Sequence, residues 1–181
     1  MYIDYKLEGK YVTLRSVEES DAEFILSVRN DPLISKYLPP LNVTVEQQRQ
    51  WITKQRADKD SYYFLMLLPN GDPIGSISVY DIEGETAETG RFCSLGDPMS
   101  NIETCLMLND FCFDVIGLKS VHIWVYEGNK SVIALNQSFG YVWTDSKKDI
   151  KGEPFKVGVL TQSKWLEKKE KIQKRIRLIN K

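Results

Sequence analysis

The segment 129–141 constrains the fold most, because it has the pattern of a short helix with a marked beginning and end. Asn129 or Ser131 can cap its first turn, apolar side chains recur at helical spacing, and Gly140 can adopt the left-handed conformation that ends a helix. The preceding run 121–126 is β-branched and aromatic, which is typical of a buried strand. A strand that leads into a helix start places backbone N–H groups where an anionic ligand can meet them. The same pattern also fits an ordinary strand–helix unit.

Composition and charge predict one soluble, reduced, cytoplasmic domain over residues 1–181. The chain has 181 residues, of which 42% are hydrophobic and 27% charged, as in globular proteins that bury a full core. Its net charge of −1 argues against broad binding to nucleic acid, and no apolar run has signal-peptide or membrane-spanning length. Cys93, Cys105 and Cys112 lack metal-ligand spacing, so we expect free thiols and no bound metal.

Hydrophobic periodicity predicts strands and helices along the whole chain. Capping boxes predict helix starts at 20–23, 44–47 and 100–103. Gly117 is expected to end the third of these helices, and Asn70-Gly71 predicts a tight turn between two strands. Strands are expected at 12–15, 62–68, 74–80, 87–95, 121–126, 141–149 and 155–161, the last two joined around Lys151-Gly152.

From about residue 163 the chain predicts a basic C-terminal helix. Lys and Arg outnumber Glu in this segment, and Trp165, Ile172, Ile176 and Ile179 fall on one helical stripe. The stripe favours a helix docked on the domain, with its charges in solvent, over an interaction tail.

In order and spacing, these segments resemble the GCN5-related N-acetyltransferase (GNAT) superfamily. Residues 129–141 resemble the last shared motif, in which an Asn after the fifth strand begins a helix that ends in Gly-Phe. Residues 11–24 resemble the first strand and the start of the first helix, 73–80 the third strand, and 87–92 the fourth. Residues 159–165 resemble the closing strand of the branch that acetylates ribosomal-protein N-termini and amino sugars.

The resemblance implies an α/β, GNAT-like fold: a mixed, mostly antiparallel seven-stranded sheet with helices on both faces, splayed between strands four and five. It also implies transfer of an acetyl group from acetyl-CoA to a primary amine by direct attack. The implied acceptor is a small-molecule amine, such as a nucleotide-linked amino sugar, or a protein N-terminus. We expect no nucleic-acid or membrane partner, and a monomer or homodimer.

Acetyl-CoA needs an exposed strand edge and the N–H groups of a helix start. By resemblance, the cofactor-binding residues are Phe92, Cys93, Ser94, Ser100, Asn101 and Asn129. The loop 96–103 departs from the family pattern, because it is shorter and has neither a second glycine nor a basic residue. Two interpretations stay open. Either the helix dipole still binds the pyrophosphate, or the site has decayed and the fold binds a ligand or partner without catalysis.

The catalytic Glu and Tyr of the branch do not carry over, because Trp124 and Asn136 stand at the matching positions. Strand alternation nevertheless places His122, Trp124 and Tyr126 on one face.

Substitute catalytic groups are therefore sought nearby. His122, the only histidine, is a candidate base, although a single strand histidine also fits a structural role. Glu88 and Asp81 are alternative bases, and Tyr126 is a candidate acid.

Acceptor recognition is assigned by resemblance to the first two helices and the loop between them. The substrate-binding candidates are Arg29, Tyr37, Trp51 and Trp124. Trp51 and Trp124 can stack on a sugar or base face, or can equally be core aromatics.

Overall fold

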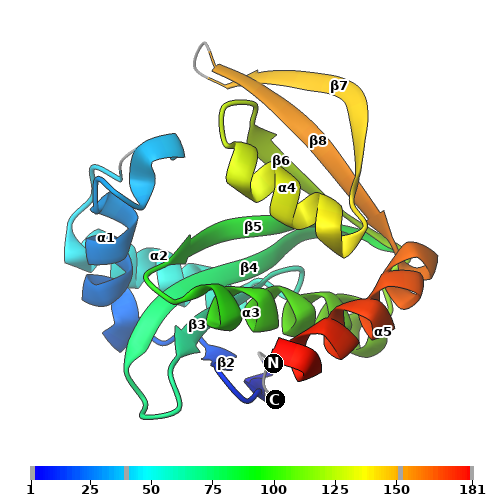
Figure 1. The fold of residues 1–181 in the computed structure, drawn as a ribbon. Helices are drawn as coiled ribbons and strands as arrows, with labels where there is room; N and C mark the ends of the chain where they lie inside the picture. Colours follow the sequence, from blue (N-terminus) through cyan, green and yellow to red (C-terminus); the bar gives the residue numbers. More distant parts are fainter. Residues whose placement is uncertain (1–2, 39–40, 151–152, 180–181) are drawn as a thin grey trace. The chain divides into compact units, whose positions relative to one another are not determined.

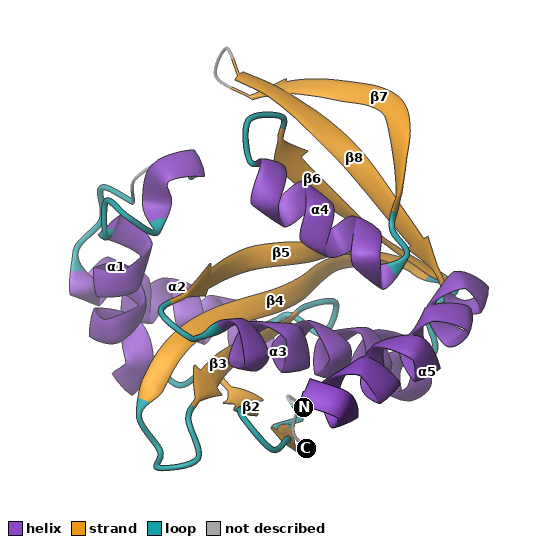
Figure 2. Cartoon of the chain, in the orientation of Figure 1, coloured by secondary structure: helices purple, strands orange, loops and turns teal. Residues whose placement is uncertain are grey.

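The structure is a computed structural model that describes residues 3–38, 41–150 and 153–179. The chain forms two compact units. Unit 1 comprises residues 1–83 and 89–108, and unit 2 comprises residues 84–88 and 109–181. Figure 1 labels the elements, and Figure 2 colours them by secondary structure. The strands follow the hydrogen-bonded order β1-β2-β3-β4-β5-β6-β8-β7.

The described residues form eight strands, one more than expected. The additional strand is β1 (Lys6–Glu8), which pairs antiparallel with β2 (Thr13–Ser16). Only the central residue of β1 is half-buried, so the segment gives no alternating hydrophobic pattern that predicts a strand. The expected mixed, mostly antiparallel sheet with accompanying helices is confirmed.

Unit 1 is built on an antiparallel meander. β2 pairs with β3 (Tyr62–Leu67), and β3 pairs with β4 (Pro73–Glu83), with Phe64 opposite Ile77. Gly71 has φ 92° in the connecting turn, as the Asn-Gly pair predicts. The four central residues of β3 are all buried, so both of its faces are covered.

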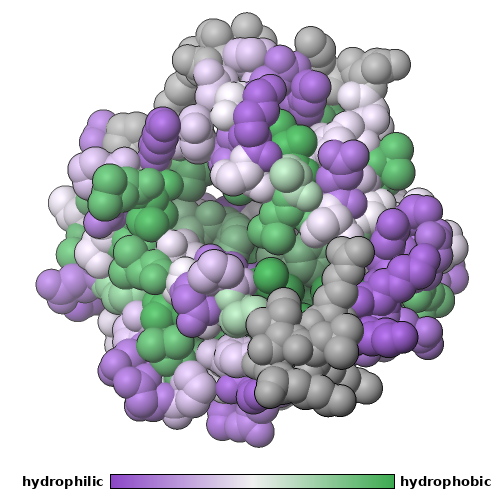
Figure 3. All heavy atoms as spheres, in the orientation of Figure 1, coloured by the Kyte–Doolittle hydropathy of each residue, from purple (hydrophilic) through white to green (hydrophobic). Residues whose placement is uncertain are grey.

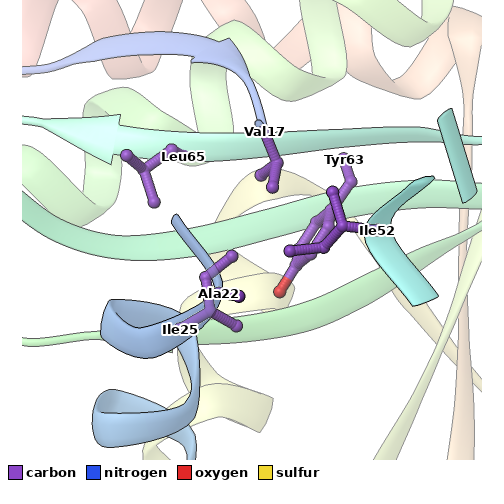
Figure 4. Packing of buried hydrophobic residues seen from close by; sticks show 6 residues of the cluster. All are labelled: Val17, Ala22, Ile25, Ile52, Tyr63 and Leu65. Atoms are coloured by element: carbon purple, nitrogen blue, oxygen red, sulfur yellow. The ribbon is translucent and has the colours of Figure 1, made fainter. Parts of the chain in front are cut away.

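The helices α1 (Ala22–Asn30) and α2 (Val45–Ala57) pack on one face of this meander. Their contact with β3 forms a buried cluster, shown in Figure 4, of Val17, Ala22, Ile25, Ile52, Tyr63 and Leu65. Full burial of each large side chain contributes about 1.5–3 kcal/mol. The cluster therefore fixes α2 against β3, the sheet neighbour of β4, which lines the candidate site described below.

The start of α2 follows the sequence prediction, whereas that of α1 does not. In the 44–47 box the two residues cap each other, as predicted. The box at 20–23 is wrong, because the reciprocal pair is Glu18 and Asp21. Arg15 holds the Asp21 carboxylate through two bonds of 2.7 Å, which fixes the turn ahead of the predicted position.

The third predicted box, at 100–103, is also wrong. In α3 (Pro98–Asp110) the Glu103 carboxylate turns away from the helix start and accepts three backbone N–H bonds. The donors are Lys10, Tyr11 and Val12, at 2.9, 2.6 and 2.9 Å. A Cβ at Gly9 would collide with this carboxylate, which accounts for the glycine.

The helix α3 continues as a π-helical turn, Phe111–Ile116, and Gly117 ends it at φ 83°. The end of this helix agrees with the prediction, because glycine adopts the left-handed conformation without steric cost.

Unit 2 pairs β6 (Ser120–Tyr126) antiparallel with β8 (Glu153–Thr161), and β8 antiparallel with β7 (Val142–Ile150). The first residues of β5 (Thr86–Ser94) pair in parallel with β6 over Thr86–Glu88. The predicted turn at Lys151-Gly152 lies outside the described residues. The expected splay between the corresponding strands depends on the relative placement of the two units and stays a prediction.

The helix predicted from residue 163 is α5 (Gln162–Ile179). Its Trp165 is fully buried, stacks on Phe139 of α4 (Lys130–Phe139), and donates its indole N–H to Asp110 at 2.9 Å. Lys169 pairs with the same carboxylate at 2.7 Å. The part of α5 that is coloured in Figure 3 is hydrophilic, as expected of a docked helix with solvated charges. Within the described part of the chain, no helix combines the length and apolarity needed to cross a bilayer.

Candidate active site

Unit 1 contains a pocket of about 360 Å³ formed by α2, the segment that follows it, β4 and β5. Its lining residues are Trp51, Lys54, Gln55, Asp58, Ser61, Tyr80, Asp81 and Arg91. Gln55 and Ser61 are buried, whereas Lys54, Asp58 and Asp81 are exposed. The pocket therefore has a buried polar floor and a charged, solvated rim.

Two lining residues have a left-handed backbone. Asp81 has φ 51° and Arg91 has φ 52°, and they are the two non-glycine residues with positive φ in the described ranges. This conformation costs an L-residue about 1–2 kcal/mol. Strained residues and strand irregularities gather at functional sites, where they redirect a side chain. Both such residues line one pocket, on strands that are neighbours in the sheet.

The Arg91 guanidinium lies close to two aromatic rings. Its guanidinium carbon lies 3.9 Å from the Tyr80 ring centroid and 5.2 Å from that of Trp51. A cation at this distance from an aromatic ring is attracted by the ring's quadrupole, and its N–H groups can still donate to a hydrogen-bond acceptor. Among the described residues, the buried Nη1 of Arg91 has no hydrogen-bond partner.

A second buried polar atom without a partner lies on the pocket floor. Gln55 donates from Nε2 to the Ser61 hydroxyl at 2.9 Å, while its Oε1 accepts no bond from the described residues. Because a buried unsatisfied group costs about 1–3 kcal/mol, the paired occurrence of one donor and one acceptor indicates a ligand-binding surface.

Arg29 from α1 reaches the same strand. Its guanidinium lies near the Cys93 thiol, two residues beyond Arg91, and its own Nη1 is buried without a partner in the described chain. Burial raises the pKa of Cys93, and Arg29 offsets part of that rise. Burial likewise raises the pKa of Tyr63, and both guanidinium groups act on it in the opposite direction. Two cations thus flank this part of unit 1.

The loop before α3 is closed by its own side chains. Ser94 accepts the Gly96 N–H at 2.9 Å and donates to Asn101 at 2.6 Å, and Asn101 donates back to the Gly96 carbonyl at 3.1 Å. A Cβ at Gly96 would meet Ile74 and Ser94, so this turn requires glycine.

Asp97 caps α3, three residues before the predicted cap Ser100. Its carboxylate accepts the Ser100 N–H at 2.8 Å, and this backbone bond lowers the Asp97 pKa. Pro98 occupies the first helical position, where its missing N–H costs nothing. The N–H group that the dipole interpretation offers to a pyrophosphate is therefore already bonded to a carboxylate.

Asn129 begins α4, as predicted. Its side-chain oxygen accepts the Val132 N–H at 3.3 Å and the Ser131 hydroxyl at 3.1 Å. Gly140 ends the helix at φ 102°. The cap is thus Asn129, and Ser131 supports it.

In unit 2, two of the predicted catalytic residues lie together. Glu88 and His122 are register partners across β5 and β6, and Glu88 Oε2 lies 3.7 Å from His122 Nε2. The side chains are 19% and 33% exposed, so both remain accessible. A carboxylate beside an imidazole is a common arrangement for accepting a proton.

Tyr126 and Trp124 share the outer face of β6 with His122, since residues 121, 123 and 125 alternate into the core. The Tyr126 ring packs against Phe155 at a centroid distance of 5.9 Å. Trp124 belongs to unit 2, whereas Trp51 lies in the pocket of unit 1. Tyr37 ends a short 3₁₀ turn, with the Lys36 ammonium 5.2 Å from its ring centroid, and it does not line the pocket.

The cysteines are free thiols, as predicted. Burial raises the pKa of Cys105 to about 12 and raises that of Cys112 further above its usual range. Such thiols are poor nucleophiles. The described residues contain no group of three His, Cys, Asp or Glu side chains that would hold a metal ion.

Sequence reasoning missed most of the pocket. It named Trp51 as a substrate residue and Asp81 as a base, but it did not single out Tyr80 or Gln55. No local pattern marks these residues, because they meet only when α2 packs on the sheet. Arg91 carried only a weak signal, since it is a charged residue within a predicted strand.

Comparison with solved structures places the fold among acetyltransferases. The chain is similar to apo FdhC, a nucleotide-linked sugar GNAT, at 24% identity and TM-score 0.78 over 93% of this chain and 97% of that one. It is similar to a GCN5-related N-acetyltransferase from Brucella melitensis at 17% identity and TM-score 0.77, over 93% and 84%. It is also similar to spermidine N-acetyltransferase from Vibrio cholerae, in complex with CoA and spermine, at 19% identity and TM-score 0.76, over 87% and 99%.

No curated protein matches the chain in sequence. The family model described as the acetyltransferase (GNAT) domain matches residues 12–142, which span most of the described strands and helices. The resemblance to the GNAT superfamily is thereby confirmed, while its narrower branch stays a prediction. The chain belongs to the GNAT acetyltransferase family.

Proposed function

We propose that this protein transfers an acetyl group from acetyl-CoA to a primary amine. The observation that carries the proposal is the Glu88–His122 pair on adjacent strands, 3.7 Å apart, in a chain of the GNAT family. Acetyl-CoA is the co-substrate of this family, and aminolysis of its thioester requires a group that removes a proton from the amine.

In the proposed reaction the neutral amine attacks the thioester carbonyl directly. A C–N bond forms and the C–S bond breaks. The amine proton passes to Glu88 or His122, and Tyr126 supplies a proton to the departing thiolate. The absence of a covalent intermediate is supported by the raised pKa values of the buried thiols Cys105 and Cys112, which are poor nucleophiles.

For the co-substrate, we propose that the pantetheine arm lies along β5 at Phe92, Cys93 and Ser94. β5 pairs with β6 only over Thr86–Glu88 among the described residues. The later residues of β5 make no hydrogen bonds in that pairing, so this edge of the strand can pair with a ligand. We propose further contacts at Ser100, Asn101 and Asn129. Support comes from the start of α4 beside Asn129, where N–H groups and the dipole favour phosphate.

The proposed acceptor is a nucleotide-linked amino sugar or another small-molecule amine, with a protein N-terminus as the alternative. Support comes from Trp51, which lines the pocket and is 37% exposed, so its ring is available for stacking. Arg29, Tyr37 and Trp124 are further proposed contacts.

Three free cysteines support a reducing, cytoplasmic location, and we expect a monomer or a homodimer.

A second candidate function is ligand binding without catalysis. It is favoured by Asp97, whose carboxylate occupies the start of α3 and repels an incoming pyrophosphate. It is also favoured by the loss of the family's Glu and Tyr, at Trp124 and Asn136.

Release of CoA, followed with a thiol reagent while acetyl-CoA is supplied with single amines, separates the two candidates. The enzyme hypothesis predicts CoA release that depends on the amine, together with an acetylated product identified by mass spectrometry. An amine that binds and shifts the melting temperature, with no CoA release from any amine in the set, supports the second candidate.

A further inference from the structure

We propose that the pocket of unit 1 selects an acceptor that carries an anionic group, a carboxylate or a phosphate, and that Arg91 binds this group. The inference rests on the proposed function, because it names the acceptor class of the same enzyme. It also separates two kinds of acceptor that the similar structures represent, a nucleotide-linked sugar and the cationic spermidine.

Arg91 has aromatic neighbours and a buried donor without a partner. The Tyr80 and Trp51 rings lie close to the guanidinium, and its Nη1 is buried without a partner in the described chain. A desolvated cationic N–H that stays unpaired is costly. A carboxylate or phosphate matches the planar, forked donors of arginine and removes that cost.

Arg91 also has a left-handed backbone conformation. Its φ of 52° is unfavourable for a residue with a side chain, and it occurs within a strand. Glycine would adopt this conformation without cost. An arginine retained there, facing a pocket, indicates that its side chain contributes something glycine cannot.

The arginines near the pocket are less exposed than its carboxylates. Arg29 does not line the pocket, but its guanidinium, which has a buried Nη1, lies near Cys93, and both arginines lower the pKa of Tyr63 against the effect of burial. The carboxylates of the pocket, Asp58 and Asp81, are on exposed residues, and Asp58 already accepts the Asp60 N–H at 3.0 Å. The buried part of the site is therefore cationic, which disfavours a polyamine.

Gln55 indicates which group of the ligand lies next to its anionic group. Gln55 presents an unpartnered Oε1 on the same pocket floor, so it accepts a hydrogen bond from the ligand. The acceptor class that satisfies both residues carries a hydroxyl or N–H donor near its anionic group, as acidic amino sugars and sugar phosphates do.

Titration calorimetry without acetyl-CoA tests this inference with glucosamine, glucosamine 6-phosphate, muramic acid and spermidine as probes. These probes compare an amino sugar without an anionic group, an amino sugar phosphate, an amino sugar carboxylate and a polycation. For the wild type we expect at least one of the two anionic sugars to bind about tenfold more tightly than glucosamine, and spermidine to bind most weakly. Equal binding of all four probes overturns the inference.

Arg91→Gln should bring the affinities for the anionic sugars down to that for glucosamine. Arg91→Lys keeps the positive charge but loses the forked pair of N–H donors, so it should retain part of the preference for anionic sugars. It replaces Arg91→Gln in the test if that variant does not fold. The matched control is Arg49→Gln, which removes an exposed guanidinium from α2 outside the pocket and should leave the preference unchanged. An unchanged preference in folded Arg91→Gln also overturns the inference.

The outcome is independent of catalysis, because binding is measured without the acetyl donor. A preference for anionic sugars without turnover contradicts the proposed function and leaves the inference standing. Turnover without a charge preference contradicts the inference alone.

Discussion

Glu88 and His122 face each other across the parallel pair β5–β6, with 3.7 Å between Oε2 and Nε2. If this pair accepts the amine proton, Glu88→Gln and His122→Gln should each lower kcat by about a hundredfold, because general-base catalysis typically contributes 10²–10⁴. Steady-state CoA release measures the effect. Glu85→Gln, an exposed carboxylate on the turn before β5, is the matched control. Full activity in both variants would assign the pair a structural role.

Asp97 is expected to make the stability of α3 dependent on pH. Its carboxylate caps Ser100, so Asp97→Ala should cost about 1 kcal/mol at neutral pH. The cap lowers the Asp97 pKa in the folded state. Its contribution is therefore fully present above the unfolded value of about 3.9 and is lost as the pH falls through the folded value. Urea unfolding of wild type and variant across that range should show the difference vanish in acid. A constant difference would contradict the cap.

Asp97 also tests whether the pyrophosphate of acetyl-CoA binds near the start of α3. Asp97→Asn keeps a capping oxygen and removes the negative charge, so acetyl-CoA affinity should rise by about twofold to fivefold, the size of a helix-terminus charge effect. Affinity unchanged by this substitution would show that the pyrophosphate does not approach the start of α3.

Glu103 is expected to be a main stabilising residue of unit 1. Its carboxylate accepts three backbone N–H bonds from residues 10–12, and bonds to charged groups contribute more than neutral ones. Glu103→Ala should lower the free energy of unfolding by about 2 kcal/mol in urea titrations. Glu170→Ala, an exposed glutamate of α5, should change it by less than about 0.5 kcal/mol. Equal effects of the two substitutions would refute the role of Glu103.

Asn129 combines a cap with a proposed contact to acetyl-CoA. Asn129→Ala should cost about 1 kcal/mol of stability, because the bond to Val132 is lost. Affinity for acetyl-CoA should fall by about tenfold, the effect of one buried hydrogen bond of about 1.4 kcal/mol. Asn129→Asp keeps the cap and separates the two roles. If folded Asn129→Ala binds acetyl-CoA as the wild type does, Asn129 is a cap only.

The sequence was sufficient to predict elements in which the local pattern and the packing agree. The helix from Asn129 to Gly140 is an example, because a capping side chain, apolar spacing and a terminal glycine all lie within one segment. Gly117 and the 44–47 box were predictable for the same reason. The strand β1 was not, because three residues stabilised mainly by pairing leave no periodic pattern.

Errors arose where a side chain serves a distant partner. Glu103 has the spacing of a capping box, but its carboxylate binds the chain 91 to 93 residues away. The candidate pocket shows the same limit, since Gln55 and Arg91 are brought together only by tertiary packing. The left-handed backbone of Arg91 is likewise invisible in the sequence, because nothing but glycine or asparagine ordinarily marks it.

Titration calorimetry of the wild type with acetyl-CoA tests the central claim most directly. The account predicts saturable binding with one site per chain, weakened in Asn129→Ala and strengthened in Asp97→Asn. No heat of binding at millimolar acetyl-CoA, in protein that is folded and still binds a sugar probe, would contradict it.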